Sequence, residues 1–231
     1  MTAAILLAGG RGTRLESVSK GEPKPMISVA GRPFIEHILD RVLDSSIDRV
    51  ILSVGYRPEA FQAHFGSDFS GLPLEYAVES EPLGTGGALL RSFRQFDLPR
   101  AFVINADTLF AIDLDTLLRS HTGASAGITS ALCRMADTSR YGTIERDEAG
   151  YITRFREKRS GAPGLINAGI YVVERAVLER FALPEKFSFE KDLLEQHVKE
   201  LRPFGFVGDA YFIDIGVPED LERARRELAT P

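Results

Sequence analysis

The sequence has one cysteine, four histidines and no long hydrophobic run. A single cysteine, Cys133, excludes an internal disulfide and a zinc site built from several cysteines. The histidines are scattered without the spacing of metal ligands. The first apolar run covers residues 3–8, far below the ~18 residues of a membrane span, and no later run approaches that length. We therefore expect a cytoplasmic protein that does not enter a membrane.

The sequence also lacks an excess of positive charge. Its 28 basic and 33 acidic residues give a formal net charge of −5 at pH 7, which argues against nucleic acid or an anionic membrane as the main partner. The distribution is uneven, because residues 1–32 hold five cations and two anions, a net of +3. Such a local basic segment is typical of a site for one small polyanion.

Short β-rich runs alternate with amphipathic helical stretches through about residue 125. This alternation predicts an α/β fold, a Rossmann-like and mostly parallel sheet with helices on both faces. We expect a helix that begins with Pro33 at its first position and buries a face containing Leu43. The expected strands are residues 3–8, 49–54, 74–79 and 101–106.

The pattern changes after residue 126. We expect a strand over 126–134, a hairpin of 141–147 and 151–156, and further strands over 166–173 and around 211–215. Helices are expected at about 174–181 and 188–199, and after Val217-Pro218. We interpret residues 1–231 as one domain, in which a half of about 126–231 lies as an accessory lobe against a half of about 1–125. The sheet edge and the lobe would then form a cleft.

The first predicted strand runs into Leu7-Ala8-Gly9-Gly10-Arg11-Gly12-Thr13-Arg14-Leu15. Three glycines in four positions let the backbone turn sharply and bring N–H groups close to an anion. A dinucleotide fingerprint would need glycine where Leu15 stands, and the Gly-Lys-Ser/Thr of a Walker loop is absent. Lys24 follows between two prolines, which restrict its backbone and fix where it points. The segment therefore predicts a phosphate-binding loop of neither of those two classes.

The motif Leu-Ala-Gly-Gly-x-Gly-Thr-Arg-Leu, followed by Pro-Lys-Pro, resembles the signature of the sugar-1-phosphate nucleotidylyltransferases. The resemblance extends along nearly the whole chain and looks closest to the D-glycero-α-D-manno-heptose 1-phosphate guanylyltransferases. It is carried further by the segments 51–56, 81–88, 140–142 and 166–169. It implies a mixed sheet of the nucleotide-diphospho-sugar transferase type with a small sugar-binding lobe. It also implies a Mg²⁺-dependent enzyme that joins GTP to a sugar 1-phosphate, with heptose preferred, and releases pyrophosphate during surface polysaccharide synthesis.

The resemblance assigns roles around the nucleotide. Arg14 and Lys24 would face its phosphates, and Asp107, at the end of a predicted strand, would bind Mg²⁺ together with Asp214. Two carboxylates combined with substrate phosphates and water suit this ion. The catalytic residues would be Arg14, Lys24 and Asp107. The residues expected to hold the nucleotide are those of the first loop: Leu7, Ala8, Gly9, Gly10, Arg11, Gly12 and Thr13.

The resemblance also assigns the sugar-phosphate pocket. At two positions, however, this sequence departs from the family pattern. Alanine stands at position 106 and arginine at position 159, where the family usually has glycine and a small residue or proline. The expected sugar-phosphate contacts are Gly142, Glu157, Lys158, Asn167 and Gly169.

A second glycine-rich stretch, residues 79–88, lies between a predicted strand and a predicted helix. Relatives that use uridine or thymidine usually have glutamine at the position of Glu79. An ionised glutamate only accepts hydrogen bonds, and guanine presents two adjacent donors, N1–H and its 2-amino group. We therefore expect Glu79, or alternatively Glu81, to read guanine, with Gly84 leaving room for the ring.

Two other functions stay open. A guanylyl- or uridylyltransferase for mannose, glucose or N-acetyl sugar 1-phosphates is one, although many such relatives carry a β-helix of hexapeptide repeats that this sequence lacks. A non-catalytic nucleotide-sugar sensor is the other, and the retained Arg14, Lys24, Asp107 and Asp214 argue against it. The sequence leaves a homodimer open.

Overall fold

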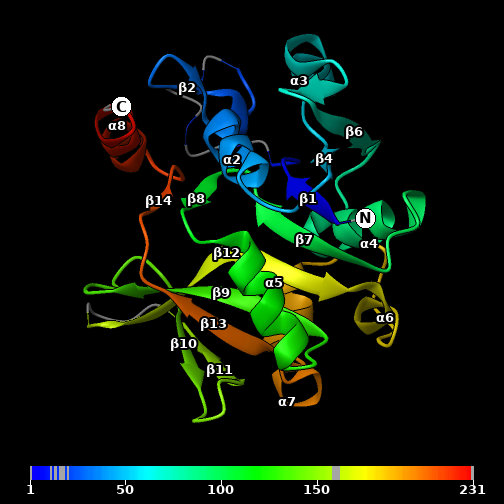
Figure 1. Cartoon of the computed structure of the whole chain (residues 1–231), viewed down its shortest axis with the longest axis vertical. Coiled ribbons are helices and arrows are strands. Elements are labelled where there is room, and N and C mark those ends of the chain that lie inside the picture. The colour runs from blue at the N-terminus through cyan, green and yellow to red at the C-terminus, as the bar shows by residue number, and fades with distance from the viewer. Residues whose placement is uncertain are drawn as a thin grey trace.

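A mixed ten-stranded sheet forms the centre of the computed structural model, which describes residues 2–10, 12, 15, 19, 21–157 and 162–229 (Figure 1). Its strands are β1 (Ala3–Leu7), β4 (Arg49–Val54), β5 (Asp68–Phe69), β6 (Leu72–Val78), β7 (Arg100–Asn105), β9 (Ile128–Met135), β10 (Thr143–Arg146), β11 (Ile152–Arg156), β12 (Gly164–Glu174) and β13 (Phe204–Gly208). They run in the order β11-β10-β12-β7-β1-β4-β6-β5, with β9 paired to β12 and β13 paired to β9.

The first-half strands confirm the predicted α/β fold. β1 pairs in parallel with both β4 and β7, and β4 pairs in parallel with β6. Each predicted strand lies within two residues of the observed one. Parallel pairing brings the carboxyl ends of β1, β4 and β7 to the same edge, where open α/β sheets bind their ligands.

β12 joins the second half to the first. Its residues 170–174 pair antiparallel with β7, and its residues 164–167 and 171–173 pair antiparallel with β9. The prediction of a lobe merely laid against the first half is therefore wrong in this respect, because one continuous sheet crosses both halves. The strand bends between Asn167 and Tyr171, where its register with β9 shifts.

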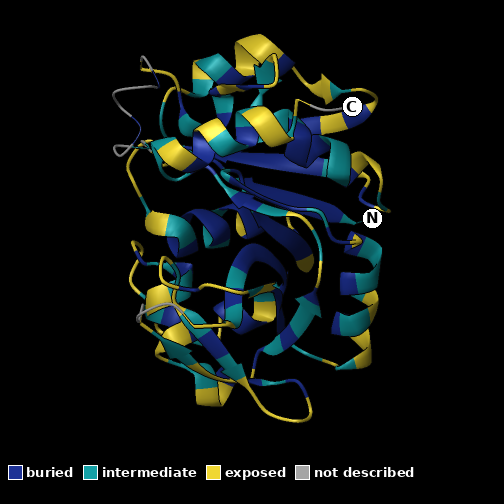
Figure 2. Cartoon of the chain, turned by 90° about the vertical axis from the view of Figure 1, so that its left-hand side faces the viewer, coloured by how far each residue is buried: buried dark blue, intermediate teal, exposed yellow. Residues whose placement is uncertain are grey.

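Helices cover both faces of the sheet. They are α2 (Phe34–Leu43), α3 (Pro58–Phe65), α4 (Gly84–Gln95), α5 (Leu114–Gly123), α6 (Arg175–Leu178), η3 (Phe189–Glu195), α7 (Val198–Leu201) and α8 (Pro218–Glu227), with a short 3₁₀ turn η2 (Lys24–Met26). Alternation along β1 separates two cores: Ala4 and Leu6 pack on the side of α2, while Ile5 packs on the side of α4 and η3. Figure 2 shows the buried strands between these helical layers.

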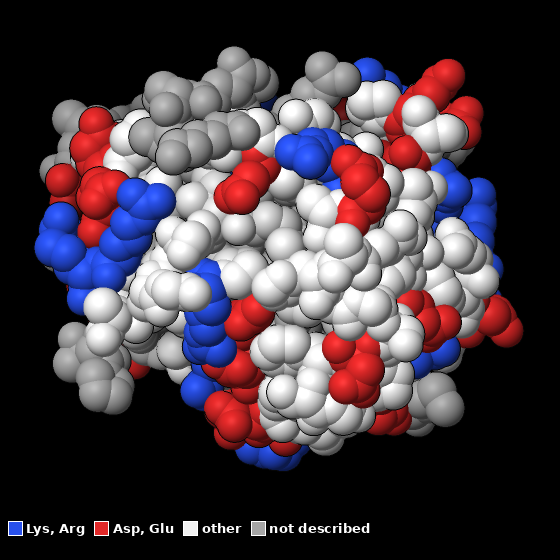
Figure 3. All heavy atoms as spheres, turned by 90° about the horizontal axis from the view of Figure 1, so that it is seen from above, with Lys and Arg blue, Asp and Glu red and all other residues white. Residues whose placement is uncertain are grey.

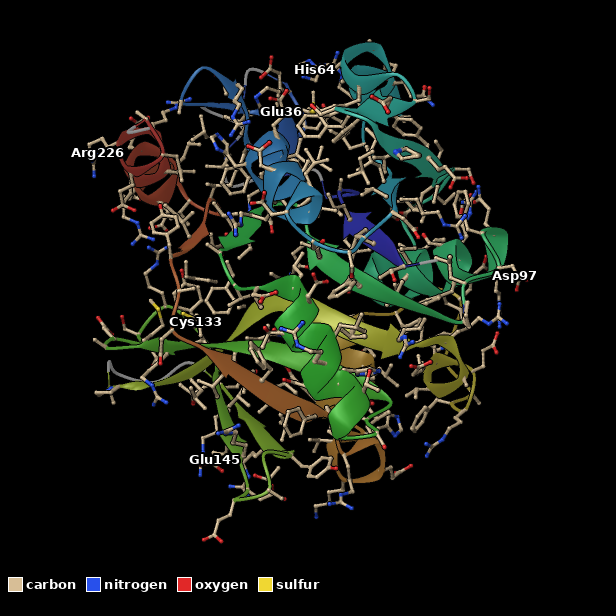
Figure 4. All side chains as sticks on the ribbon, in the orientation of Figure 1. Glu36, His64, Asp97, Cys133, Glu145 and Arg226 are labelled. Carbon is tan, nitrogen blue, oxygen red and sulfur yellow. The ribbon has the colours of Figure 1, made fainter. Side chains whose placement is uncertain are left out.

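Two details of α2 differ from expectation. Pro33 is the residue before the first turn rather than its first member, and Leu43 is 38% exposed. Leu43 is the last residue of the helix, where it passes beyond the edge of the core. In its first turn, α2 contacts α3 through Glu36, whose carboxylate lies 2.6 Å from His64 Nε2 (Figure 4).

Several predicted elements of the second half differ from the structure. The stretch expected as one helix over 188–199 is a π-helix, η3, followed by the separate turn α7, and α6 covers only four residues. Among the described residues, five strands were not predicted: β13 in this half, and β2 (Ser28–Val29), β3 (Arg32–Pro33), β5 and β8 (Thr108–Phe110) in the first. β8 pairs with β14 (Phe212–Asp214). β8 is too short for a periodicity, and its partner lies about a hundred residues further along the chain.

No helix in the described part of the chain combines the length and apolar character that crossing a membrane demands. From above, Lys and Arg side chains lie beside Asp and Glu rather than gathering into a field of one sign (Figure 3). Ion pairs such as Arg225–Glu222, 2.6 Å apart on α8, account for this mixture.

Candidate functional site

Two cavities meet at the carboxyl ends of β1 and β7. The first, of about 380 Å³, is called the Lys24 cavity and is lined by Leu7, Ala8, Gly10, Gly12, Lys24, Pro25, Asp107, Asp214 and Gly216. The second, of about 510 Å³, is called the Glu79 cavity. Leu7, Gly10 and Asp107 line both. One elongated ligand can therefore occupy both.

The first glycine loop is held against the ends of the strands. The N–H of Ala8 donates to the backbone oxygen of Ser53 over 2.8 Å. Gly12 has φ +64°, and a Cβ there would lie 2.9 Å from Lys24 Cβ. The glycine is thus required both by its left-handed backbone and by the packing of Lys24. The expected roles of Arg11, Thr13 and Arg14 fall outside the described residues.

Lys24 lies between two carboxylates. Its Nζ is 2.6 Å from Asp107 Oδ2 and 3.7 Å from Asp214 Oδ1. The antiparallel pair β8–β14 causes this convergence, because its register sets Asp214 opposite Thr108, the neighbour of Asp107. The structure therefore brings together Lys24, Asp107 and Asp214, which are distant in sequence.

The two carboxylates suit a divalent cation. Burial, followed by the charge of Asp107, raises the pKa of Asp214, although Lys24 and the N–H of Gly216 partly oppose this rise. One lysine faces two carboxylates here, so the group keeps an unbalanced negative charge when all three are ionised. Among the described residues there is no group of three or more His, Cys, Asp or Glu side chains placed to hold a metal. Two aspartates that need substrate phosphates to complete the ligand set match the way Mg²⁺ is bound.

Glu79 forms part of the wall of the second cavity. Its Oε2 accepts the N–H of Leu83 over 3.0 Å, which fixes the side chain. Its Oε1 approaches the first loop so closely that a Cβ on Gly9 would lie 2.9 Å away. Glu81 lines the same cavity but is exposed to solvent. Glu79 is therefore the better placed of the two carboxylates to read a base.

Gly84 also lines the Glu79 cavity, but the expected reason for it is wrong. Its φ is +72°, and a Cβ there would lie 2.5 Å from the backbone oxygen of Phe187. The missing side chain therefore makes room for the chain around Phe187, and not for a ring in the cavity. The N–H groups of Gly86 and Gly87 donate to that same oxygen, over 3.0 and 3.4 Å. These two N-terminal donors of α4 are thus used within the protein.

The predicted sugar contacts lie apart from these cavity walls. Gly169 packs against Asn105, which lines the Glu79 cavity, and Asn167 accepts the Gly169 N–H. Gly142 and Glu157 line neither cavity. A Cβ on Gly142 would lie 2.8 Å from the Arg156 backbone oxygen, so this glycine serves strand packing rather than simply admitting a ring. Lys158 falls outside the described residues.

Glu157 is exposed and lies near Glu195, the last residue of η3. Burial first, and the charge of Glu157 second, raise the pKa of Glu195.

Several residues that line the cavities were not predicted as site residues: Ser53, Gly55, Tyr56, Asn105 and Gly216. The first four stand at the ends of β4 and β7, beside the end of β1. The rule that placed Asp107 at the carboxyl edge of the sheet applies equally to these positions and could have found them.

Comparisons with known proteins identify the family of the chain. Residues 3–230 match a family model described as nucleotidyl transferase. The chain is 42% identical over 225 residues to D-glycero-alpha-D-manno-heptose 1-phosphate guanylyltransferase of Aneurinibacillus thermoaerophilus, covering 97% of each protein. It is 43% identical over 217 residues to the enzyme of that name from Campylobacter jejuni, covering 94% of this chain and 96% of the relative. The crystal structure of HddC from Yersinia pseudotuberculosis complexed with GMP-PN superposes with a TM-score of 0.87 at 33% identity, covering 99% of this chain and 100% of that one.

Proposed function

The chain belongs to the nucleotidyl transferase family and is a sugar-1-phosphate nucleotidylyltransferase, and on that premise we propose the substrates GTP and D-glycero-α-D-manno-heptose 1-phosphate. The products are GDP-heptose and pyrophosphate. Two relatives of nearly the same length bear the name of this activity, and a structural neighbour at 33% identity was crystallised with GMP-PN.

Glu79 is the observation that carries the choice of guanine. A carboxylate has about four lone-pair positions and no donor. The Leu83 N–H takes one of them, which leaves enough acceptors for guanine N1–H and the 2-amino group together. Uracil and thymine present one N–H between two carbonyl oxygens, and those oxygens would face an acceptor.

The charges of the two connected cavities favour the base at one end and the phosphates at the other. The base occupies the Glu79 cavity, and the triphosphate extends past Gly10 into the Lys24 cavity, whose ammonium attracts it. An oxygen of the sugar phosphate attacks the α-phosphorus of GTP, and the bond to the β-phosphate oxygen breaks as pyrophosphate leaves. The attacking oxygen is already ionised, so the chain needs to supply no nucleophile and no base.

Bringing two polyanions together is the main cost of this reaction. Two like unit charges ~4 Å apart repel by ~4 kcal/mol at an effective dielectric constant near 20. Lys24 offsets part of this repulsion, and Asp107 and Asp214 would hold Mg²⁺ beside it. When bound, Mg²⁺ would neutralise phosphate charge and orient the reacting groups. Lys24 then exchanges an aspartate partner for a phosphate oxygen. A cytoplasmic location, a homodimer and a role in surface polysaccharide synthesis stay predictions.

Pyrophosphate release tests the proposal. The purified protein is assayed with GTP, ATP, UTP and CTP against heptose, mannose and glucose 1-phosphates, with magnesium and after chelation by EDTA. We expect the highest kcat/KM for GTP with the heptose and no turnover with EDTA. Higher kcat/KM for UTP, for a hexose phosphate, or full activity without a divalent cation would contradict the corresponding part of the proposal.

A further inference from the structure

A series of hydrogen bonds links the start of α4 to the bend in β12. Thr85 Oγ1 donates to Glu190 Oε2 over 2.8 Å, and the Tyr171 hydroxyl donates to Glu190 Oε1 over 3.4 Å. The Tyr171 oxygen accepts an N–H of Asn167 Nδ2 over 2.6 Å, and Asn167 Oδ1 accepts the Gly169 N–H over 3.1 Å. The series therefore runs from a wall of the Glu79 cavity to a predicted sugar contact.

The carboxylate of Glu190 sets the direction of these bonds. Hydroxyls of Thr85, Tyr171 and Ser188 all face it, and an ionised carboxylate only accepts. The single proton of Tyr171 therefore points at Glu190, which leaves the lone pairs of the Tyr171 oxygen for Asn167. Tyr171 is completely buried, and burial together with Glu190 raises its pKa well above the usual value, so it keeps this proton.

The amide of Asn167 is consequently held from both ends. The side-chain amide of an unrestrained asparagine can flip, exchanging the positions of Oδ1 and Nδ2, at little cost in free energy. Here Oδ1 is bound to the Gly169 N–H and one Nδ2 hydrogen is bound to Tyr171. Within the described part of the chain, the second Nδ2 hydrogen is left without an acceptor. That hydrogen is a donor of fixed direction for an oxygen of a ligand.

Glu190 is itself held in place by α4. It is the second residue of the π-helix η3, a rare form of helix that occurs frequently at functional sites. The N–H of Phe189 donates to Thr85 Oγ1 over 2.9 Å, so α4 fixes the backbone next to Glu190 as well as its side chain.

We infer that Glu190 is a positioning residue for the sugar 1-phosphate, acting through Tyr171 to aim the free amide hydrogen of Asn167 at a sugar hydroxyl. The inference rests on the proposed function, because it takes Asn167 to contact the sugar. Glu190 and Tyr171 would then touch neither substrate and still determine how tightly the sugar is bound.

Two nearly isosteric variants test the inference. Tyr171→Phe removes the acceptor for Asn167, and Glu190→Gln leaves one acceptor oxygen where Thr85 and Tyr171 need two. Losing the orientation given by one hydrogen bond should raise the KM for the sugar 1-phosphate by about 5- to 10-fold. The KM for GTP and the kcat at saturating sugar should stay within about twofold of wild type, because no group at the reacting phosphorus changes.

The control is Tyr151→Phe, which removes a hydroxyl that donates to the Ala124 backbone oxygen over 3.1 Å in another part of the second half. It should leave both KM values unchanged. All variants are assayed with whichever nucleotide and sugar pair gives the highest turnover, and thermal unfolding confirms that each is folded.

Asn167→Ala separates the inference from its premise. If it raises the sugar KM while Tyr171→Phe and Glu190→Gln do not, the positioning role is refuted and the sugar contact stands. If Asn167→Ala leaves the sugar KM unchanged, the proposed sugar contact fails, and the inference fails with it. An equal rise of both KM values in the two positioning variants would indicate a general structural effect and would also refute the inference.

Discussion

Replacing Glu79 by glutamine should change the preferred base. In the structure, Oε2 accepts the Leu83 N–H, so the oxygen of a glutamine must occupy that place if this bond is to survive. The amide NH₂ then takes the position of Oε1 beside Gly9. The glutamine NH₂ would then face the N–H groups of guanine, so that two donors meet. Uracil could instead donate its N–H to the remaining lone pair of the glutamine oxygen and accept the glutamine NH₂ at one of its carbonyl oxygens. The opposite amide orientation would place NH₂ against the Leu83 N–H instead.

The size of the effect follows from one mismatched hydrogen bond. Leaving a buried polar group unpaired costs about 1–3 kcal/mol. Since 1.4 kcal/mol corresponds to a factor of ten, kcat/KM for GTP should fall by about 5- to 150-fold. The kcat/KM for UTP or dTTP should rise, so the ratio between the nucleotides changes by more than either value alone.

The measurement is kcat/KM for pyrophosphate release with each nucleotide at a fixed sugar 1-phosphate concentration. Glu81→Gln is the matched variant, because Glu81 lines the same cavity but is exposed. We expect it to preserve the ratio of GTP to UTP. An unchanged ratio in Glu79→Gln would refute the base-reading argument, and a shift confined to Glu81→Gln would assign that role to Glu81.

Three further predictions concern the Lys24 cavity. Asp107→Asn should lower kcat by about 100-fold or more while the protein stays folded, because it removes a charge that holds the cation and Lys24; near wild-type turnover would contradict a metal role. Gly12→Ala should destabilise the protein by about 1–2 kcal/mol and reduce turnover by displacing Lys24. The control is Gly21→Ala, which has φ +83° and nothing within 4 Å of an added Cβ and should therefore carry only the backbone cost. Equal turnover in the two variants would count against the Lys24 contact. Folding raises the pKa of Asp214, so the ionised carboxylate destabilises the folded state at pH values above that raised pKa. This destabilisation disappears as the pH falls toward the usual carboxyl range, where Asp214 is protonated in the folded state. Asp214→Asn should therefore raise the melting temperature of the metal-free protein at neutral pH while lowering turnover, and a lower melting temperature would contradict the sign.

Local patterns in the amino-acid sequence were enough to predict the short-range features of the chain. The strand Arg49–Val54 was predicted to the residue because a short apolar run between polar segments is a local signal. The glycine loop and the proline-bracketed Lys24 were likewise recognisable, since turn chemistry and restricted backbones depend on neighbouring residues. The resemblance carried by these motifs identified the family, which the comparisons confirm.

Which distant residues meet depends on the packing of whole elements. The pairing of β8 with β14 brings Asp214 beside Asp107, and neither strand carries a periodicity long enough to reveal its partner. The purpose of Gly84 was misjudged because the atom that requires it, the backbone oxygen of Phe187, is about a hundred residues away in the chain. The π-helix that presents Glu190 to Thr85 and Tyr171 was also beyond local patterns. Contacts of this kind depend on where whole elements pack, and the free energy that selects such packing is a property of the complete fold.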